Sequence, residues 1–128
     1  MALPFILLVR TPPPPAAGPV FVLVHGLGMS SRSMMPTAHL LAVADEVHVI
    51  DLPGFGKSGQ PRPALSISDL VDALALWMQK QEIASPVLTG NSPGAQVIAD
   101  YAARHPGRLS SAVFLAPIID PRARRLII

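Results

Sequence analysis

Apolar runs and amphipathic stretches alternate along the whole chain. Continuous runs without alternation predict strands that are buried on both faces. They cover residues 20–24, 47–50, 87–89 and 112–116, and a further apolar run covers residues 4–10. Apolar residues at helical spacing predict helices over residues 33–44, 67–81 and 93–104. This order predicts an α/β fold, with a mostly parallel sheet and helices on both faces.

The whole chain, residues 1–128, fits one domain, with no internal repeat and no second domain. Residues 11–19 contain five prolines, which is typical of a proline-rich ligand or of a stiff connector. We favour the connector, because the stretch lies between two apolar runs. In the clearest helix, Ser66 precedes the first turn and Asp69 follows three residues later, which predicts an N-terminal cap.

The composition is apolar, with 50% hydrophobic and 14% charged residues and a mean hydropathy of +0.44. A parallel sheet covered on both faces has this character, and so does a core with apolar surface left open. No run reaches the ~18 apolar residues of a membrane helix. The first run is short, contains Pro4 and lacks a basic flank, so we interpret it as a strand rather than a signal peptide and expect a cytoplasmic protein.

Charge and cysteine content exclude several function classes. The formal net charge is +2, and Arg122, Arg124 and Arg125 contribute much of it. No aromatic residues interleave with these arginines, so we expect a solvated helix start and no nucleic-acid partner. The chain has no cysteine, which removes disulfides, thiolate metal sites and cysteine nucleophiles. The sequence implies no cofactor and no metal.

Chemistry-bearing residues follow three of the predicted strands. His25 and Gly26 follow the run at 20–24, Asp51 follows the run at 47–50, and Ser92 comes soon after the run at 87–89. In open α/β sheets, sites form at the carboxyl ends of the strands. The sequence therefore predicts one site that contains all three segments.

A glycine-rich loop resembles a phosphate-binding motif without its context. Residues 54–59 (Gly-Phe-Gly-Lys-Ser-Gly) match G-x-G-x-x-G and include the Gly-Lys-Ser of a P-loop. A P-loop needs glycine at position 51, where this chain has Asp51. Both motifs also need a helix that starts at the loop, but Pro61 and Pro63 follow. We therefore expect a tight turn, and a nucleotide-binding domain is a weak rival interpretation.

A second motif supplies a candidate nucleophile. Gly90, Asn91, Ser92, Pro93 and Gly94 fit G-x-S-x-G between a predicted strand and a predicted helix, the context of a nucleophile elbow. Side chains at positions 90 and 94 would collide with neighbouring backbone in such a turn. Ser92 could equally be an ordinary helix cap, with the proline at the first helical position. The motif alone leaves both interpretations open.

Three motifs together resemble the α/β-hydrolase superfamily. Residues 25–28 (His-Gly-Leu-Gly) resemble its oxyanion loop, residues 51–58 resemble its D-x-P-G-x-G-x-S turn, and residues 90–95 resemble its elbow. They occur in the family's order and cover about residues 20–120. A serine at position 92 resembles the nucleophile of serine esterases, lipase-like enzymes and carbon–carbon bond hydrolases. The resemblance implies a single incomplete domain that corresponds to the N-terminal half of such an enzyme and ends before its cap and C-terminal strands.

The resemblance also implies roles for individual residues. Ser92 would attack the carbonyl of a small acyl substrate and form an acyl-enzyme. The N–H of Leu27 would donate to the oxyanion, with Gly26 and Gly28 in the same loop. His25 is expected to hold the loop rather than to act as a base.

The remaining polar candidates are expected to be structural. Asp51 would fix its turn by local hydrogen bonds. His39, His48 and His105 fall on a helix, within a strand and at a helix end, respectively. No good base follows Ser92 in the sequence, and Asp120 is the remaining candidate for the catalytic acid.

Pro93 departs from the family pattern. The residue after the nucleophile normally supplies the second oxyanion N–H, and proline has none. Losing one such donor typically costs ~10²–10³ in rate. The leading hypothesis is therefore a weak or inactive serine hydrolase, and the rival is a non-catalytic binding protein of the same fold. The open edge of the last strand also predicts self-association.

Overall fold

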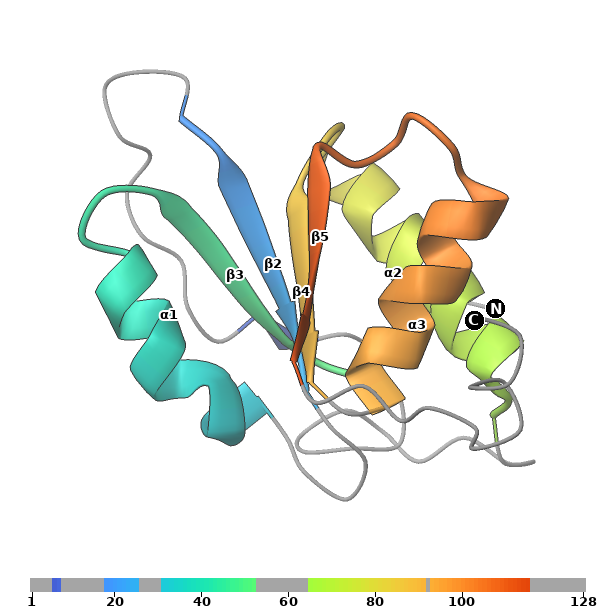
Figure 1. Cartoon of the computed structure of the whole chain (residues 1–128), viewed down its shortest axis with the longest axis horizontal. Coiled ribbons are helices and arrows are strands. Elements are labelled where there is room, and N and C mark those ends of the chain that lie inside the picture. Colours follow the sequence, from blue (N-terminus) through green and yellow to red (C-terminus); the bar gives the residue numbers. More distant parts are fainter. Residues whose placement is uncertain (1–5, 8–17, 26–30, 53–64, 92, 116–128) are drawn as a thin grey trace, which may run out of the picture.

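The computed structural model describes residues 6–7, 18–25, 31–52, 65–91 and 93–115 (Figure 1). Within these residues the strands form one five-stranded sheet in the order β1-β3-β2-β4-β5. Four strands are parallel, and β1 pairs antiparallel with β3. The strands are β1 (Ile6–Leu7), β2 (Val20–Val24), β3 (Glu46–Asp51), β4 (Val87–Asn91) and β5 (Ser111–Leu115). The predicted α/β class with a mostly parallel sheet is confirmed.

In the part of the chain that the structure describes, three α-helices connect the parallel strands. They are α1 (Met35–Leu41), α2 (Ile67–Lys80) and α3 (Pro93–Arg104). The helix predicted over residues 33–44 was wrong at both ends, because Ser31–Met34 form a separate 3-10 turn, η1, and the α-helix stops at Leu41. Pro36 explains the late start, since proline is tolerated only in the first turn of a helix.

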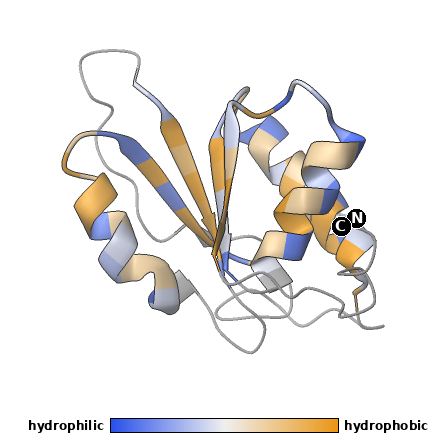
Figure 2. Cartoon of the chain, in the orientation of Figure 1, coloured by the Kyte–Doolittle hydropathy of each residue, from blue (hydrophilic) through white to orange (hydrophobic). Residues whose placement is uncertain are grey.

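The sheet carries an apolar layer on each face. Leu23, Val47 and Val49 pack with α1 on one side. On the other side Val22, Val24 and Ile50 belong to a larger core with α2 and α3, which lie side by side in Figure 1. Neighbouring residues of one strand therefore enter different cores, as the two-residue repeat of a strand requires. Figure 2 shows β2, which serves both cores, as apolar along its length.

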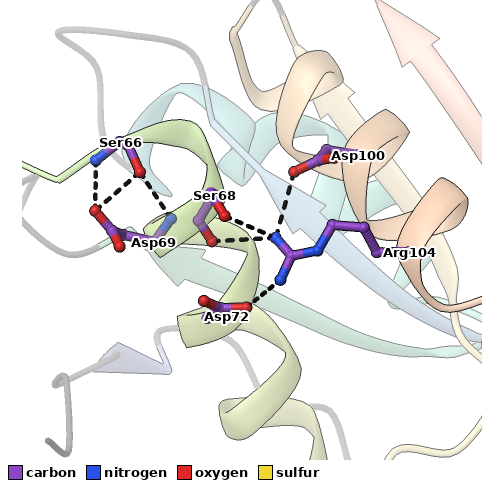
Figure 3. Close-up of polar contacts among 6 residues, drawn as sticks. All are labelled: Ser66, Ser68, Asp69, Asp72, Asp100 and Arg104. Atoms are coloured by element: carbon purple, nitrogen blue, oxygen red, sulfur yellow. Dashed lines mark hydrogen bonds and ion pairs between the residues drawn. The ribbon is translucent and has the colours of Figure 1, made fainter.

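Polar contacts fix α2 at its start and clamp it to α3. Ser66 and Asp69 form the predicted cap, in which the Asp69 N–H donates to Ser66 Oγ (3.1 Å) and the Ser66 N–H to Asp69 Oδ2 (2.8 Å). From α3, Arg104 reaches Asp72 and donates to Ser68 Oγ at 3.1 Å (Figure 3). The hydrogen bond to Asp72 raises the pKa of Arg104, so this cation stays charged. These contacts set how α2 and α3 lie against each other.

The last strand has an open edge. Within the described residues β5 pairs only with β4. Three of its apolar side chains are exposed: Val113 by 41%, Phe114 by 46% and Leu115 by 40%. This edge is the least covered apolar part of the described sheet.

Candidate active site

The carboxyl ends of β2, β3 and β4 lie next to one another in the sheet. β2 has β3 on one side and β4 on the other, so the chain leaves the end of β2 in one direction and the end of β4 in the other. Such a reversal of strand order opens a crevice in α/β proteins. The paired residues Val24 and Ile50, and Val24 and Gly90, show that these three ends are level. The structure thus brings together the three strand ends from which the predicted site segments start.

The junction between β4 and α3 has no room for side chains at its two glycines. A Cβ on Gly90 would lie 2.5 Å from the carbonyl oxygen of Gly94. A Cβ on Gly94 would lie 2.5 Å from the carbonyl oxygen of Val24 and 2.6 Å from that of His25. The collisions predicted from the sequence are therefore present. The start of α3 is pressed directly against the last residues of β2.

Ser92 itself lies outside the described residues, but both of its neighbours are placed. Asn91 ends β4 and Pro93 begins α3. The serine thus stands between a parallel strand and a helix, which is the local context of a nucleophile elbow. Pro93 at the first helical position also suits an ordinary helix start.

His25 follows β2 and ties it to the end of β3. The backbone N–H of Leu52 donates to His25 Nε2 at 2.9 Å, and the imidazole is fully buried. When Nε2 of a neutral ring accepts, Nδ1 carries the proton, so neither nitrogen keeps a free lone pair. His25 therefore ties the end of β2 to the residue after β3. No local pattern in the sequence indicates Leu52 as the partner of His25.

Asp51 is buried as well, with 1% exposure, and pairs with Ile6 of β1 at the end of β3. Three other predicted parts of the site lie outside the described residues. These are the loop of Gly26, Leu27 and Gly28, the glycine-rich turn at 54–59, and Asp120.

The other three histidines are placed away from the β4–α3 junction. His39 is exposed on α1, on the opposite face of the sheet from α3. His48 is buried within β3, where Nε2 lies 2.6 Å from Glu46 Oε1 and the ring packs edge-on against Trp77. His105 follows the last residue of α3, and a 12-residue helix is about 18 Å long, so it cannot be the base for Ser92.

The described residues contain neither a candidate metal cluster nor a helix suited to span a membrane. No group of three or more histidine, cysteine, aspartate or glutamate side chains in that part of the chain could hold a metal ion. None of the helices described there is long and apolar enough to cross a membrane.

The geometry agrees with the comparison to protein families. The model of the alpha/beta hydrolase fold matches residues 19–124, which include the β2 end, the β3 end and the β4–α3 junction. The chain belongs to the α/β-hydrolase fold family. The family model spans every described element except β1.

Curated relatives of this α/β-hydrolase chain include esterases and lipases. It is 34% identical over 99 residues to the pimeloyl-[acyl-carrier protein] methyl ester esterase of Chromobacterium violaceum, covering 77% of this chain and 37% of that protein. It is 39% identical over 98 residues to the biotin biosynthesis bifunctional protein BioHC of Cellvibrio japonicus, covering 77% and 18%. It is 27% identical over 100 residues to the (lyso)-N-acylphosphatidylethanolamine lipase of Homo sapiens, covering 75% and 29%.

Solved structures share the fold. Est816, an N-acyl homoserine lactone degrading enzyme, superimposes with a TM-score of 0.81 at 20% identity over 98% of this chain and 49% of its own. A probable hydrolytic enzyme from Pseudomonas aeruginosa gives 0.80 at 23% identity over 91% and 42%. The present chain spans less than half the length of each relative named here.

Proposed function

We propose that Ser92 is the nucleophile of a serine hydrolase that acts on a carboxylic ester or a similar small acyl substrate. The observation that carries this proposal is the β4–α3 junction, where backbone occupies the space of any side chain at Gly90 or Gly94. An ordinary helix cap needs no such approach of a helix start to a neighbouring strand. Esterases and lipases among the relatives support the ester class.

The proposed reaction proceeds through an acyl-enzyme. Ser92 Oγ would attack the substrate carbonyl as its proton leaves for a base, and the C–O bond to the alcohol would then break. The N–H of Leu27 would donate to the oxyanion, and Gly26 and Gly28 would let the loop approach. His25 would hold this loop through the bond that it accepts from Leu52.

We expect slow chemistry from this chain as it stands. The four histidines of the sequence are all described, and none is placed to take the proton of Ser92. A serine without its base is a weak nucleophile near neutral pH. Asp120 stays our candidate for the acid.

A fluorophosphonate probe tests the proposal directly. The purified chain is treated with the probe, its intact mass is read, and Ser92→Ala is run beside it. We expect slow labelling of one site that disappears in the variant. A folded chain, checked by near-ultraviolet circular dichroism, that stays unlabelled would contradict the proposal.

Pro93 favours a second candidate function, a binding protein that keeps the fold without catalysis. Proline begins α3 and cannot donate the second oxyanion hydrogen bond. In the hydrolase, Pro93→Ala would restore that donor and raise the labelling rate by about 10²-fold. In the binding protein, neither Pro93→Ala nor the parent chain would be labelled.

Self-association through β5 is a separate proposal. A second copy of the chain can pair with an open strand edge, and Val113, Phe114 and Leu115 offer it exposed apolar surface. We expect light scattering to report a mass above 13.5 kDa at high concentration. Val113→Lys should lower that mass, whereas Ala103→Lys, at an exposed position of α3, should not. A concentration-independent monomer would contradict the proposal.

A further inference from the structure

A cavity of about 660 Å³ lies between α2 and α3, at the opposite end of the strands from the candidate active site. Its lining includes Ile83 and Ala84, which precede β4, and His105 and Arg108, which precede β5. It therefore opens near the amino ends of β4 and β5, whereas the active-site residues follow the carboxyl ends. A five-residue strand such as β4 separates the two ends by about 17 Å.

One wall of the cavity is built on a tight turn. The N–H of Arg108 donates to the carbonyl of His105 at 3.2 Å, which closes a four-residue turn. Pro106 is its second residue, and Gly107, with a φ of 79°, is its third. This is the pattern of a type II turn, which needs a positive φ at the third position. The turn fixes His105 and Arg108 at its two ends, so both side chains belong to one short rigid segment.

Two polar residues, His105 and Arg108, belong to this wall. His105 Nε2 is buried and has no hydrogen-bond partner in the described structure. The ring of His105 lies against that of Tyr101, with centroids 4.7 Å apart. Burial raises the pKa of Tyr101, and the positive charge of Arg108 opposes this shift. Among the described ion pairs, Arg108 takes part in none.

The opposite wall, from α2 and the residues after it, is mainly apolar. Leu76, Met78 and Ile83 line it. It carries two carboxylates, and that of Asp72 is already engaged by Arg104 (Figure 3). Glu82 is the other, so a ligand would turn its negative end away from Glu82 and toward α3. The cavity thus has a cationic end at Arg108, in the turn after α3, and an apolar side on α2.

We propose that this cavity binds a small carboxylate with an apolar body. The carboxylate would accept charge-assisted hydrogen bonds from the guanidinium of Arg108. The apolar body would pack against Leu76 and Ile83. This second site goes beyond the proposed hydrolase function and does not depend on Ser92.

Tyr101 is the single tyrosine of the chain, so it offers a direct readout. The full chain is labelled with 3-fluorotyrosine, and its one ¹⁹F resonance is followed during titration with 3-phenylpropionate. We expect a saturable shift. Acetate, which lacks the apolar body, and 3-phenylpropanamide, which lacks the charge, should each bind at least about tenfold more weakly.

Arg108→Gln should weaken 3-phenylpropionate binding by about tenfold. Lys80→Gln is the matched control, since it removes the same charge from an exposed residue of α2 that does not line the cavity. The proposal is overturned if the resonance does not shift saturably or if the amide binds as well as the acid. Equal losses in the two variants would also overturn it, since they would indicate general attraction rather than a site. The ligand comparison needs no variant, so a misfolded Arg108→Gln would not protect the proposal.

Discussion

The two ends of the sheet need glycine for different physical reasons. At the carboxyl ends, Gly94 does not need a positive φ, but the carbonyls of Val24 and His25 fill the space of its missing Cβ. At the amino ends, Gly107 has nothing within 4 Å of an added Cβ, yet its φ is 79°. The first glycine is required by packing between elements and the second by the torsion of one turn. The two ends should therefore respond to substitution on different scales.

Glu82 completes the comparison, because it occupies a position at the amino ends that usually belongs to glycine. Its φ is 58°, and it follows Gln81, the C-cap residue of α2. The N–H of Ile83 donates to Met78 and that of Glu82 to Gln79, at 2.9 and 3.1 Å. This is a Schellman motif, whose left-handed residue is commonly glycine. The torsional demand at this end is thus mild enough for a glutamate to meet it.

Gly94→Ala should have the largest effect. A Cβ at 2.5 Å from backbone oxygen forces α3 away from β2, and overpacking of this kind costs about 3 kcal/mol. Urea unfolding followed by tryptophan fluorescence measures it, and Ala103→Ser at an exposed position of α3 is the control. A cost below about 1 kcal/mol would mean that the close approach is easily relieved.

Gly107→Ala should cost less, about 1 kcal/mol, because only the left-handed torsion opposes it. Gly107→Asn should cost less than the alanine variant, since asparagine tolerates this region better. The same unfolding experiment ranks the two. If alanine at 107 were as harmful as alanine at 94, the contrast between the two ends would fail.

Glu82→Gly should stabilise the chain, by about 0.5 kcal/mol. The gain is the relief of the left-handed glutamate, less the greater backbone entropy of glycine in the unfolded chain. Glu82→Ala separates torsion from charge, because alanine removes the carboxylate but keeps the strain. A glycine variant no more stable than the alanine variant would show that torsion is not the cause.

The smallest expected effect is a pH dependence at the start of α2. Hydrogen bonds from the Ser66 backbone and side chain lower the pKa of Asp69 below its ordinary 3.8. A lowered folded-state pKa stabilises the fold above the unfolded value, and this contribution disappears as the pH falls through the folded value. Asp69→Asn mimics the protonated acid. The stability difference between parent and variant should therefore be constant above pH 3.8 and shrink below it; a difference that persists in acid would contradict this.

Local patterns in the sequence sufficed for several elements. The buried run of β2, the Ser66 cap and Pro93 at the first position of α3 all act within a few residues, and each was predicted where it occurs. Pro36 carried a local signal as well, but the prediction of a helix from residue 33 ignored it. The lack of space for side chains at Gly90 and Gly94 was predicted from the motif and its position between strand and helix.

Contacts between distant residues could not be predicted. The bond from Leu52 to His25 spans 27 residues, and Arg104 meets Ser68 and Asp72 across 36 and 32. Only the packing of the elements brings these partners together. The same holds for the cavity between α2 and α3, where the Pro106-Gly107 turn is visible in the sequence but the opposing wall of α2 is not.

The position of β2 between β3 and β4 has a consequence for the order of folding. Phe21 pairs with Val47, 26 residues later, and with Val87, 66 residues later. Closing the longer loop costs about 0.8 kcal/mol more in chain entropy, so the pair of β2 with β3 should form first. During synthesis on the ribosome, one edge of β2 would stay unpaired until β4 and α3 emerge. A chaperone would bind this exposed edge during that interval.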